Sequence, residues 1–314
     1  MTSKGYNKNN QLLFKYLDDL RKQITRDGSL SLYSLNYGEG FHDTDGALEE
    51  SINKYLLPAN LDHFSNKNKI NILDVCMGLG YNSGCILEEL LKSKHKIAWH
   101  GLEIDQRPLD LGLNEKRFQE LWSPKVLDFF QCLKKTGRWA EGFNEGTIHW
   151  GDARQKLYEI NDSLSFDLIL LDPFSPQKCP ELWSEQFISL LSSRLSLDGR
   201  LITYSSSASI RASFKRAGLR IYSINPSIKE KKRWSSGTVA MKKKLDKKLI
   251  SKNCQFKELS KRELEHLDTR SSIPYRDPTG KGNSKEIILT RQIEQSESQL
   301  MHTSTWRKRW NTAR

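Results

Sequence analysis

The segment Leu171-Asp172-Pro173-Phe174-Ser175-Pro176 combines an acid, an aromatic ring and two prolines directly after an apolar run. In an open α/β sheet, the carboxyl end of such a run faces the ligand crevice. Asp172 at that position can accept a hydrogen bond from an incoming amine, orient its lone pair and help to remove its proton. Phe174 offers a flat face to a base or a cation, and the prolines stiffen the loop. The structural alternative is that Asp172 only caps the next element beside a turn-forming proline.

A second group of candidates lies in Asp74-Val75-Cys76-Met77-Gly78-Leu79-Gly80-Tyr81-Asn82, between an apolar run and a helical pattern. Glycines there let the backbone approach a ligand closely, although two glycines also suit a plain tight turn. A dinucleotide fingerprint would need a third glycine where Ser83 stands, which disfavours NAD and FAD. We assign four residues of this segment to a cofactor site: Asp74, Gly78, Gly80 and Asn82.

Two carboxylates follow the next apolar runs in order. Glu103, in Gly101-Leu102-Glu103-Ile104-Asp105, is placed to accept hydrogen bonds from both hydroxyls of a ribose. Asp152, in Gly151-Asp152-Ala153, is placed to accept one from the amino group of adenine, or else to cap a helix. The glycine segment and these acids together indicate an adenosyl ligand.

An adenosyl ligand beside Asp172 predicts S-adenosylmethionine as the cofactor and nitrogen as the methyl acceptor. An alkylammonium must lose a proton before it can attack, and a carboxylate serves that step. Carbon methylation of a pyrimidine would use a cysteine nucleophile, but we interpret Cys179 as a packing residue. Besides Phe174, the candidate substrate-binding residues are His42 and Lys178, although a lone histidine in a turn is more often structural.

These residues need a sheet to position them. From Ile70 to Met241, apolar runs alternate with helical patterns, which predicts an α/β fold with a parallel sheet between helices. Together with the adenosyl site, this pattern indicates a Rossmann-like class I S-adenosylmethionine-dependent methyltransferase fold. We expect a mostly parallel seven-stranded sheet with helices on both faces. The expected strands are 70–75, 97–102, 146–150, 166–171, 199–204, 219–224 and 237–241, the last two forming a hairpin. The expected helices include 180–195 and 207–217.

The remaining chain divides into three parts. Residues 1–65 form a leader that we expect to pack over the active site, with a turn-rich segment at 33–46 and a helical pattern at 47–57. Residues 66–245 form the methyltransferase domain, with a helical insertion at about 123–145. Residues 246–314 form a C-terminal extension with a basic tail.

The chain has 314 residues and a formal net charge of +12, which fits either a polyanionic partner or a solvated surface. Lys231–Trp234 and Trp306–Trp310 mix cations with aromatic rings, as expected for gripping phosphates and stacking on bases; a disordered charged tail is the alternative for the second. The five cysteines lack paired spacing, so no metal site is indicated. Without a signal peptide or an apolar span, a cytoplasmic protein without membrane contact is expected.

With these residues in view, the chain resembles the methyltransferase half of MnmC, a bifunctional tRNA-modifying family, and more closely its stand-alone members. The resemblance runs from Phe41 to about Arg291. The matching blocks are Asp45-Gly46-Ala47-Leu48-Glu49-Glu50, Gly78-Leu79-Gly80-Tyr81-Asn82, Leu171–Pro176 with Pro180-Glu181-Leu182-Trp183, Tyr204-Ser205-Ser206-Ser207 with Ile210-Arg211, and Pro274-Tyr275-Arg276-Asp277-Pro278.

The resemblance implies methyl transfer to the exocyclic amine of 5-aminomethyluridine, often 2-thiolated, at the wobble position of tRNA. By matching positions, Gly78, Gly80, Glu103 and Asp152 would hold S-adenosylmethionine and Asp172 would serve the amine. Cys76 departs from the glycine of the bifunctional members. No second glycine fingerprint follows, so no FAD-dependent oxidase half is expected, and the aminomethyl group would be made elsewhere. The implied partner is tRNA, with no obligatory protein partner evident.

Two other hypotheses remain open. An aminopropyltransferase of the polyamine class shares this fold and an acid after the fourth strand, although it usually carries a longer loop of glycines and acids. A non-catalytic RNA-binding module on a methyltransferase fold would bind tRNA without cofactor affinity.

Overall fold

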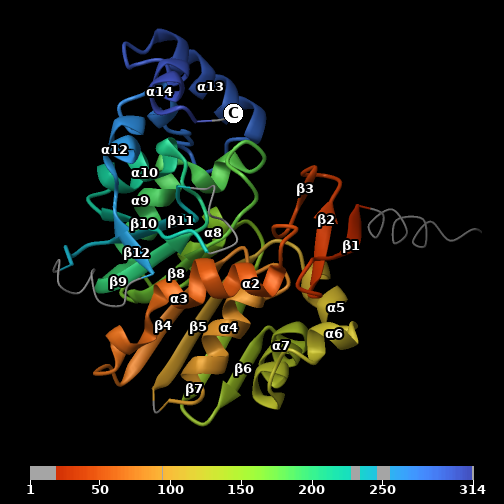
Figure 1. Cartoon of the computed structure of the whole chain (residues 1–314). Coiled ribbons are helices and arrows are strands. Elements are labelled where there is room, and N and C mark those ends of the chain that lie inside the picture. The colour runs from red at the N-terminus through yellow and green to blue at the C-terminus, as the bar shows by residue number, and fades with distance from the viewer. Residues whose placement is uncertain (1–18, 94, 228–233, 246–254, 313–314) are drawn as a thin grey trace, which may run out of the picture.

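The computed structural model describes residues 19–93, 95–227, 234–245 and 255–312 (Figure 1). Within these ranges, nine strands form one sheet in the order β12-β10-β11-β9-β8-β4-β5-β7-β6. All neighbouring pairs from β9 to β7 are parallel, and the outer pairs are antiparallel. The strands are β4 (Lys69–Val75), β5 (Lys96–Glu103), β6 (Arg138–Glu141), β7 (Asn144–Trp150), β8 (Phe166–Leu171), β9 (Leu195–Thr203), β10 (Arg220–Ile224), β11 (Gly237–Met241) and β12 (Phe256–Glu258).

The Rossmann-like fold is confirmed, and its sheet is wider than predicted. The expected seven strands are present, and β6 and β12 each add one strand at an edge. The expected helical insertion at 123–145 is therefore only partly helical. Helix α7 (Pro124–Thr136) ends at Gly137, whose φ of 73° is left-handed, and the chain returns as a hairpin of β6 and β7. Both edge strands are too short for a two-residue alternation to be recognised in the sequence.

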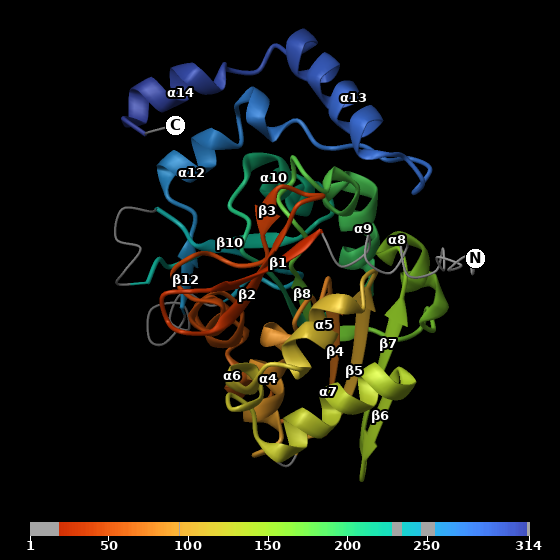
Figure 2. The same ribbon diagram turned by 90° about the vertical axis from the view of Figure 1, so that its right-hand side faces the viewer.

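Helices cover both faces of the sheet, and each face has its own apolar core. In β8 the alternation of side chains is visible, since Leu168 and Leu170 join one core and Ile169 and Leu171 the other. The first face carries α4 (Tyr81–Leu90), α5 (Arg107–Leu113), α6 (Lys116–Gln119) and α7. The second carries α8 (Ala153–Lys156), η3 (Leu157–Glu159), η4 (Pro180–Trp183), α9 (Glu185–Arg194) and α10 (Ala208–Arg216). Figures 1 and 2 show the sheet between these two layers.

The leader begins with a small antiparallel sheet of β1 (Leu20–Ile24), β2 (Leu30–Ser34) and β3 (Glu39–Gly40). A helix follows where the pattern at 47–57 predicted one. It runs as α2 (Ala47–Ser51), the π-helical turn η1 (Ile52–Leu56) and α3 (Leu57–Ala59), and a short turn η2 (Leu61–Phe64) leads into β4. The π turn packs on the first face, where Tyr55 is buried in the core.

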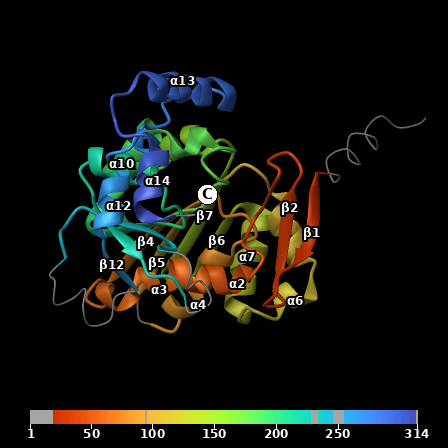
Figure 3. The ribbon, with the colours of Figure 1, turned by 45° about the horizontal axis from the view of Figure 1, so that its top comes forward.

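The C-terminal extension supplies the edge strand β12 and continues as α12 (Lys261–His266), η6 (Arg270–Ser272), α13 (Ser284–Glu297) and α14 (Thr303–Trp310). Figures 1 to 3 show α13 and α14, in blue, on the opposite side of the central sheet from α4. Arg211 of α10 anchors the extension through a buried ion pair with Glu263, 2.9 Å from Nη1 to Oε1.

The aromatic rings of the tail do not serve as predicted. Trp306 is buried and stacks on His266 with ring centroids 4.1 Å apart, and Trp310 Nε1 donates to Glu265 Oε2 at 2.8 Å. Trp306 is therefore not available for stacking on bases, and the partly buried Trp310 is tied to α12 through its indole nitrogen. In the other basic segment, residues 231–233 lie outside the described residues, and the Trp234 ring contacts the guanidinium groups of Arg211 and Arg262.

Among the helices of the described ranges, none is both long and apolar enough to cross a bilayer.

Candidate active site

The sheet register aligns the carboxyl ends of the central strands. Val75 of β4 lies opposite Leu102 and Leu171, and Glu103 of β5 lies opposite Trp150. The loops that carry the predicted residues therefore meet at one edge, where the structure has a cavity of about 790 Å³. That volume lies within the range of small-molecule sites. The leader and the strand-end loops share its lining.

Asp172 lines this cavity, and both of its oxygens are held. Oδ1 accepts a hydrogen bond from Tyr55 Oη at 2.6 Å, and Oδ2 accepts one from Asn82 Nδ2 at 2.7 Å. Tyr55 Oη also accepts one from Tyr204 N at 3.3 Å. Asn82, predicted to bind the cofactor, is thus seen holding Asp172. Sequence reasoning missed Tyr55. In the sequence it resembles any core aromatic residue on a helix, and nothing near it indicates which residue its hydroxyl contacts.

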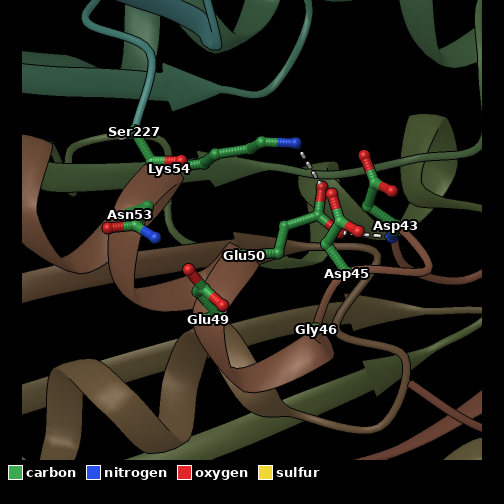
Figure 4. Close-up of a pocket in the computed structure, with 8 residues that line it drawn as sticks. All are labelled: Asp43, Asp45, Gly46, Glu49, Glu50, Asn53, Lys54 and Ser227. Carbon is green, nitrogen blue, oxygen red and sulfur yellow. Dashed lines mark hydrogen bonds and ion pairs between the residues drawn. The ribbon is translucent and has the colours of Figure 1, made fainter. Parts of the chain in front are cut away.

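Glu50 influences the ionisation of Asp172. Burial and the nearby negative charge of Glu50 raise the pKa of Asp172 to about 8, against the opposing effect of the hydrogen bonds from Tyr55 and Asn82. Glu50 Oε1 accepts a hydrogen bond from Lys54 Nζ at 2.8 Å, and Oε2 accepts one from the Asp43 backbone at 2.6 Å. Figure 4 shows Lys54 reaching along the helix toward Glu50.

We expect these neighbours to shift the pH dependence of activity in opposite directions. Glu50→Gln removes a negative charge and should lower the pKa of Asp172, whereas Tyr55→Phe removes a donor and should raise it, each by about one unit. The measurement is kcat/KM against pH, which should rise as Asp172 loses its proton. Ionisation of the substrate affects the unaltered protein and both variants equally. Identical inflection points in the three pH profiles would therefore contradict the assignment of the observed pKa to Asp172.

The glycine segment forms a tight turn fixed by Glu103. Gly78 and Gly80 have φ of 57° and 97°, and a Cβ added at Gly80 would lie 2.6 Å from Cε1 of Phe130. The buried Glu103 accepts hydrogen bonds from Gly78 N at 2.8 Å through Oε2 and from Ile104 N at 2.7 Å through Oε1. Burial raises the pKa of Glu103, and these backbone donors oppose the rise.

Cys76 adopts a left-handed conformation, with φ of 66°, at the position where the resemblance expects glycine. A side chain there strains the backbone by about 1–2 kcal/mol, and a β-branched one by more. Cys76→Gly should therefore change the free energy of unfolding by less than about 1 kcal/mol, because relief of strain offsets unfolded-chain entropy. Cys76→Val should destabilise by about 2 kcal/mol or more.

Urea unfolding measures both changes. Cys85→Val is the control for valine at a cysteine position, because Cys85 lies within helix α4; Cys85 is buried, whereas Cys76 is partly buried. An equal cost of valine at both positions would contradict backbone strain at Cys76.

Two buried acceptors near the glycine turn bear on the fit of a cofactor. Within the described residues, Asp74 Oδ1 and Asn82 Oδ1 have no hydrogen-bond partner, while Asp74 Oδ2 accepts from Ser83 Oγ at 2.5 Å. Burial raises the pKa of Asp74 to about 7. Asp74 and Asn82 lie outside the cavity lining itself, whose carboxylates include Glu103, Asp105 and Asp172. Such a site suits a ligand with hydroxyl groups and positive charge, which fits S-adenosylmethionine.

Asp152 is the N-cap of α8, the structural alternative considered above. It accepts a hydrogen bond from Arg154 N at 2.9 Å and pairs with the Arg154 guanidinium. Asp152 does not itself line the cavity. Its neighbour Gly151 donates a hydrogen bond from N to the carbonyl of Glu103 at 2.7 Å, so Asp152 lies beside the cavity wall.

Aromatic rings line part of the cavity. Phe174 stacks on Tyr37 at 4.2 Å between ring centroids, and Phe41 meets its edge at 5.1 Å. His42 also lines the cavity; burial lowers its pKa to about 4, so it is neutral near pH 7. Lys178 is exposed and lies outside the lining, near Gly38.

Sequence reasoning missed Tyr37, Phe41 and Glu39. Glu39 accepts a hydrogen bond from Ser175 N at 3.0 Å and ties the leader to the loop after β8. Only the expectation that the leader packs over the active site pointed toward this contact. Cys179 is buried and packs in the second core, and burial raises its pKa far above the usual range, which suits packing better than nucleophilic attack. In the part of the chain that the structure describes, no cluster of acids, histidines and cysteines is arranged to hold a metal ion.

Comparisons with known proteins agree with this geometry. Residues 116–242 match a family model described as S-adenosyl-L-methionine-dependent methyltransferase. The chain is 28% identical to the uncharacterized protein MJ0670 of Methanocaldococcus jannaschii, over 85% of this chain and 70% of that protein. It is also 28% identical to the tRNA 5-methylaminomethyl-2-thiouridine biosynthesis bifunctional protein MnmC of Azoarcus sp., over 60% of this chain but only 31% of that protein.

A solved structure extends the similarity to nearly the whole chain. The crystal structure of MNMC2 from Aquifex aeolicus superimposes with a TM-score of 0.74 and 27% identity, covering 95% of this chain and 94% of that one.

Proposed function

Because the chain is an MnmC-like S-adenosylmethionine-dependent methyltransferase, we propose that it methylates the aminomethyl nitrogen of 5-aminomethyluridine at the wobble position of tRNA, with or without 2-thiolation. The observation that carries this proposal is the carboxylate of Asp172, held by Tyr55 and Asn82 in a cavity that also contains stacked aromatic rings. The biosynthetic product in the names of the bifunctional relatives supports the choice of nucleoside.

In this proposal Gly78 and Gly80 let the backbone approach the cofactor, and Glu103 accepts hydrogen bonds from its ribose. Asp152 accepts one from the adenine amino group, and Asp74 contributes its Oδ1, unpartnered within the described ranges, as an acceptor beneath the turn. When bound, S-adenosylmethionine supplies an electrophilic methyl group. Asn82 has two roles in this proposal. Its Nδ2 donates a hydrogen bond to Asp172, and its Oδ1, which has no other partner in the described part of the chain, accepts one from the cofactor.

The chain's own residues prepare the amine. Asp172 accepts a hydrogen bond from it, orients the lone pair and takes up the proton, and a pKa raised to about 8 brings the carboxylate's basicity closer to that of an alkylamine. Tyr55 and Asn82 restrict the carboxylate to one orientation. The Phe174 and Tyr37 rings pack against the uracil, with neutral His42 nearby and Lys178 at the rim.

The proposed substrate, tRNA, is a polyanion, and a net charge of +12 favours its binding. The side chains of Arg307, Lys308 and Arg309 are exposed on α14, and Arg309 also contacts Glu265 at 3.5 Å. We propose that such cations contact tRNA phosphates and that the reaction takes place in the cytoplasm.

The test uses purified protein, S-adenosylmethionine and tRNA from cells that accumulate 5-aminomethyluridine, followed by nucleoside mass spectrometry. We expect 5-methylaminomethyluridine to form and 5-aminomethyluridine to decrease. Transfer to putrescine from decarboxylated cofactor would instead support an aminopropyltransferase. Binding of tRNA without any cofactor in equilibrium dialysis would support a non-catalytic module.

A further inference from the structure

Arg154 connects the C-terminal extension to the acid that follows β7. Its guanidinium binds Asp152 through Nε, 3.1 Å from Oδ1, and through Nη2, 2.7 Å from Oδ2. The remaining nitrogen, Nη1, donates to Asp277 Oδ2 at 2.6 Å and to the Gly282 carbonyl at 2.9 Å. One side chain therefore joins Asp152 to the loop between η6 and α13.

Asp277 is the fixed end of this connection. Its side chain is 1% exposed, compared with 35% for Asp152. Its other oxygen accepts a hydrogen bond from Gly282 N at 2.9 Å, and its backbone N donates to Gln186 Oε1 at 2.8 Å. A Cβ added at Gly282 would lie 2.9 Å from Asp277 Oδ1, so the loop closes tightly around the carboxylate.

Asp152 is the more exposed end of this connection. Both of its oxygens contact Arg154, but a carboxylate oxygen can accept a further hydrogen bond. A guanidinium bound in a planar fork also restricts the orientation of the carboxylate that it contacts. Since Nη1 is tied to Asp277, the orientation of Asp152 depends on a residue that lies more than a hundred positions along the chain.

We propose that Asp277 is a positioning residue for the cofactor: it holds Arg154, which in turn orients Asp152 toward the adenine amino group. This inference rests on the proposed function, specifically on the contact between Asp152 and adenine. The C-terminal extension then contributes to cofactor selectivity without touching the cofactor.

The test compares the binding of S-adenosylhomocysteine with that of its analogue containing purine in place of adenine, which lacks only the amino group. By isothermal titration, the unaltered protein should prefer the adenine compound by about tenfold or more. Asp152→Ser keeps a helix cap and should abolish the preference. Asp277→Asn should reduce it by at least about threefold, and should raise the KM for S-adenosylmethionine while kcat at saturation stays unchanged.

Arg276→Gln is the matched control, because Arg276 is in the same loop but pairs with Glu185 and Glu294; it should keep the full preference. Arg154→Lys, which keeps the charge without the fork, is a second variant that should act like Asp277→Asn. Full preference in Asp277→Asn and Arg154→Lys, with loss in Asp152→Ser, would overturn this inference alone. Full preference in Asp152→Ser would overturn the adenine contact as well, whereas methyl transfer to tRNA is tested separately by nucleoside analysis.

Discussion

Asp172→Asn should lower kcat for methyl transfer by about 10²–10⁴-fold, because the amide has nearly the same shape but cannot take up the proton of the amine. Cofactor affinity should change by less than about threefold, since the proposed role of Asp172 is to bind the amine that accepts the methyl group. Single-turnover kinetics with S-adenosylmethionine and tRNA bearing 5-aminomethyluridine, combined with equilibrium binding of the cofactor, measures both quantities.

A stability measurement separates this loss from misfolding. The folded-state pKa of Asp172 is raised to about 8, so the protonated form is favoured by folding, and the associated stability is lost as the pH rises through that value. The neutral asparagine avoids this loss, so the variant should be at least as stable as the unaltered protein above pH 8. Full activity in Asp172→Asn would end the proposed role of Asp172.

Glu103→Gln should raise the dissociation constant for S-adenosylmethionine by about 10²-fold, because charge-assisted hydrogen bonds to the ribose contribute about 1.5–3 kcal/mol each. The change also weakens the hydrogen bond that Oε2 accepts from Gly78 N, and this bond fixes the glycine turn. At saturating cofactor the variant should regain most of its kcat, since the amine site is unchanged.

Glu145→Gln is the control for a general effect of removing a carboxylate. Glu145 lies in β7 opposite Ala98, toward the other end of the sheet, and forms an ion pair with Lys69 on the surface. Its replacement should leave cofactor affinity unchanged. Equal weakening by the two variants would argue against a specific role of Glu103.

The sequence predicted the central sheet, and it predicted Asp172 and Glu103 at the edge of the sheet where the structure has its cavity. Parallel strands buried on both faces are nearly continuous apolar runs, as in β8, so their ends and the loops that follow them can be located directly. Asp172 and Glu103 follow such runs, and the register of β4, β5 and β8 then brings them to one edge. Their roles in binding and catalysis stay predictions until the experiments above are done.

Contacts made across the chain could not be predicted in this way. Tyr55 and Asp172 are 117 positions apart, and no local pattern records that their side chains meet. Trp306 shows the opposite failure: a tryptophan among cations looked suited to bases, but burial against His266 gave it a structural role. Composition identifies the type of surface, whereas packing decides which side chains remain available.

The π turn of the leader helix has a consequence for comparing this chain with its relatives. A π turn contains one residue more than the α-helical turn it replaces, so the helix before Ile52 and the helix after Leu56 are out of phase. Tyr55 lies within that turn. A homologue shortened by one residue there would rotate its side chains by about 100° and present a different neighbour to Asp172. An alignment without a gap at this turn would then pair the tyrosine with a residue that never reaches the carboxylate.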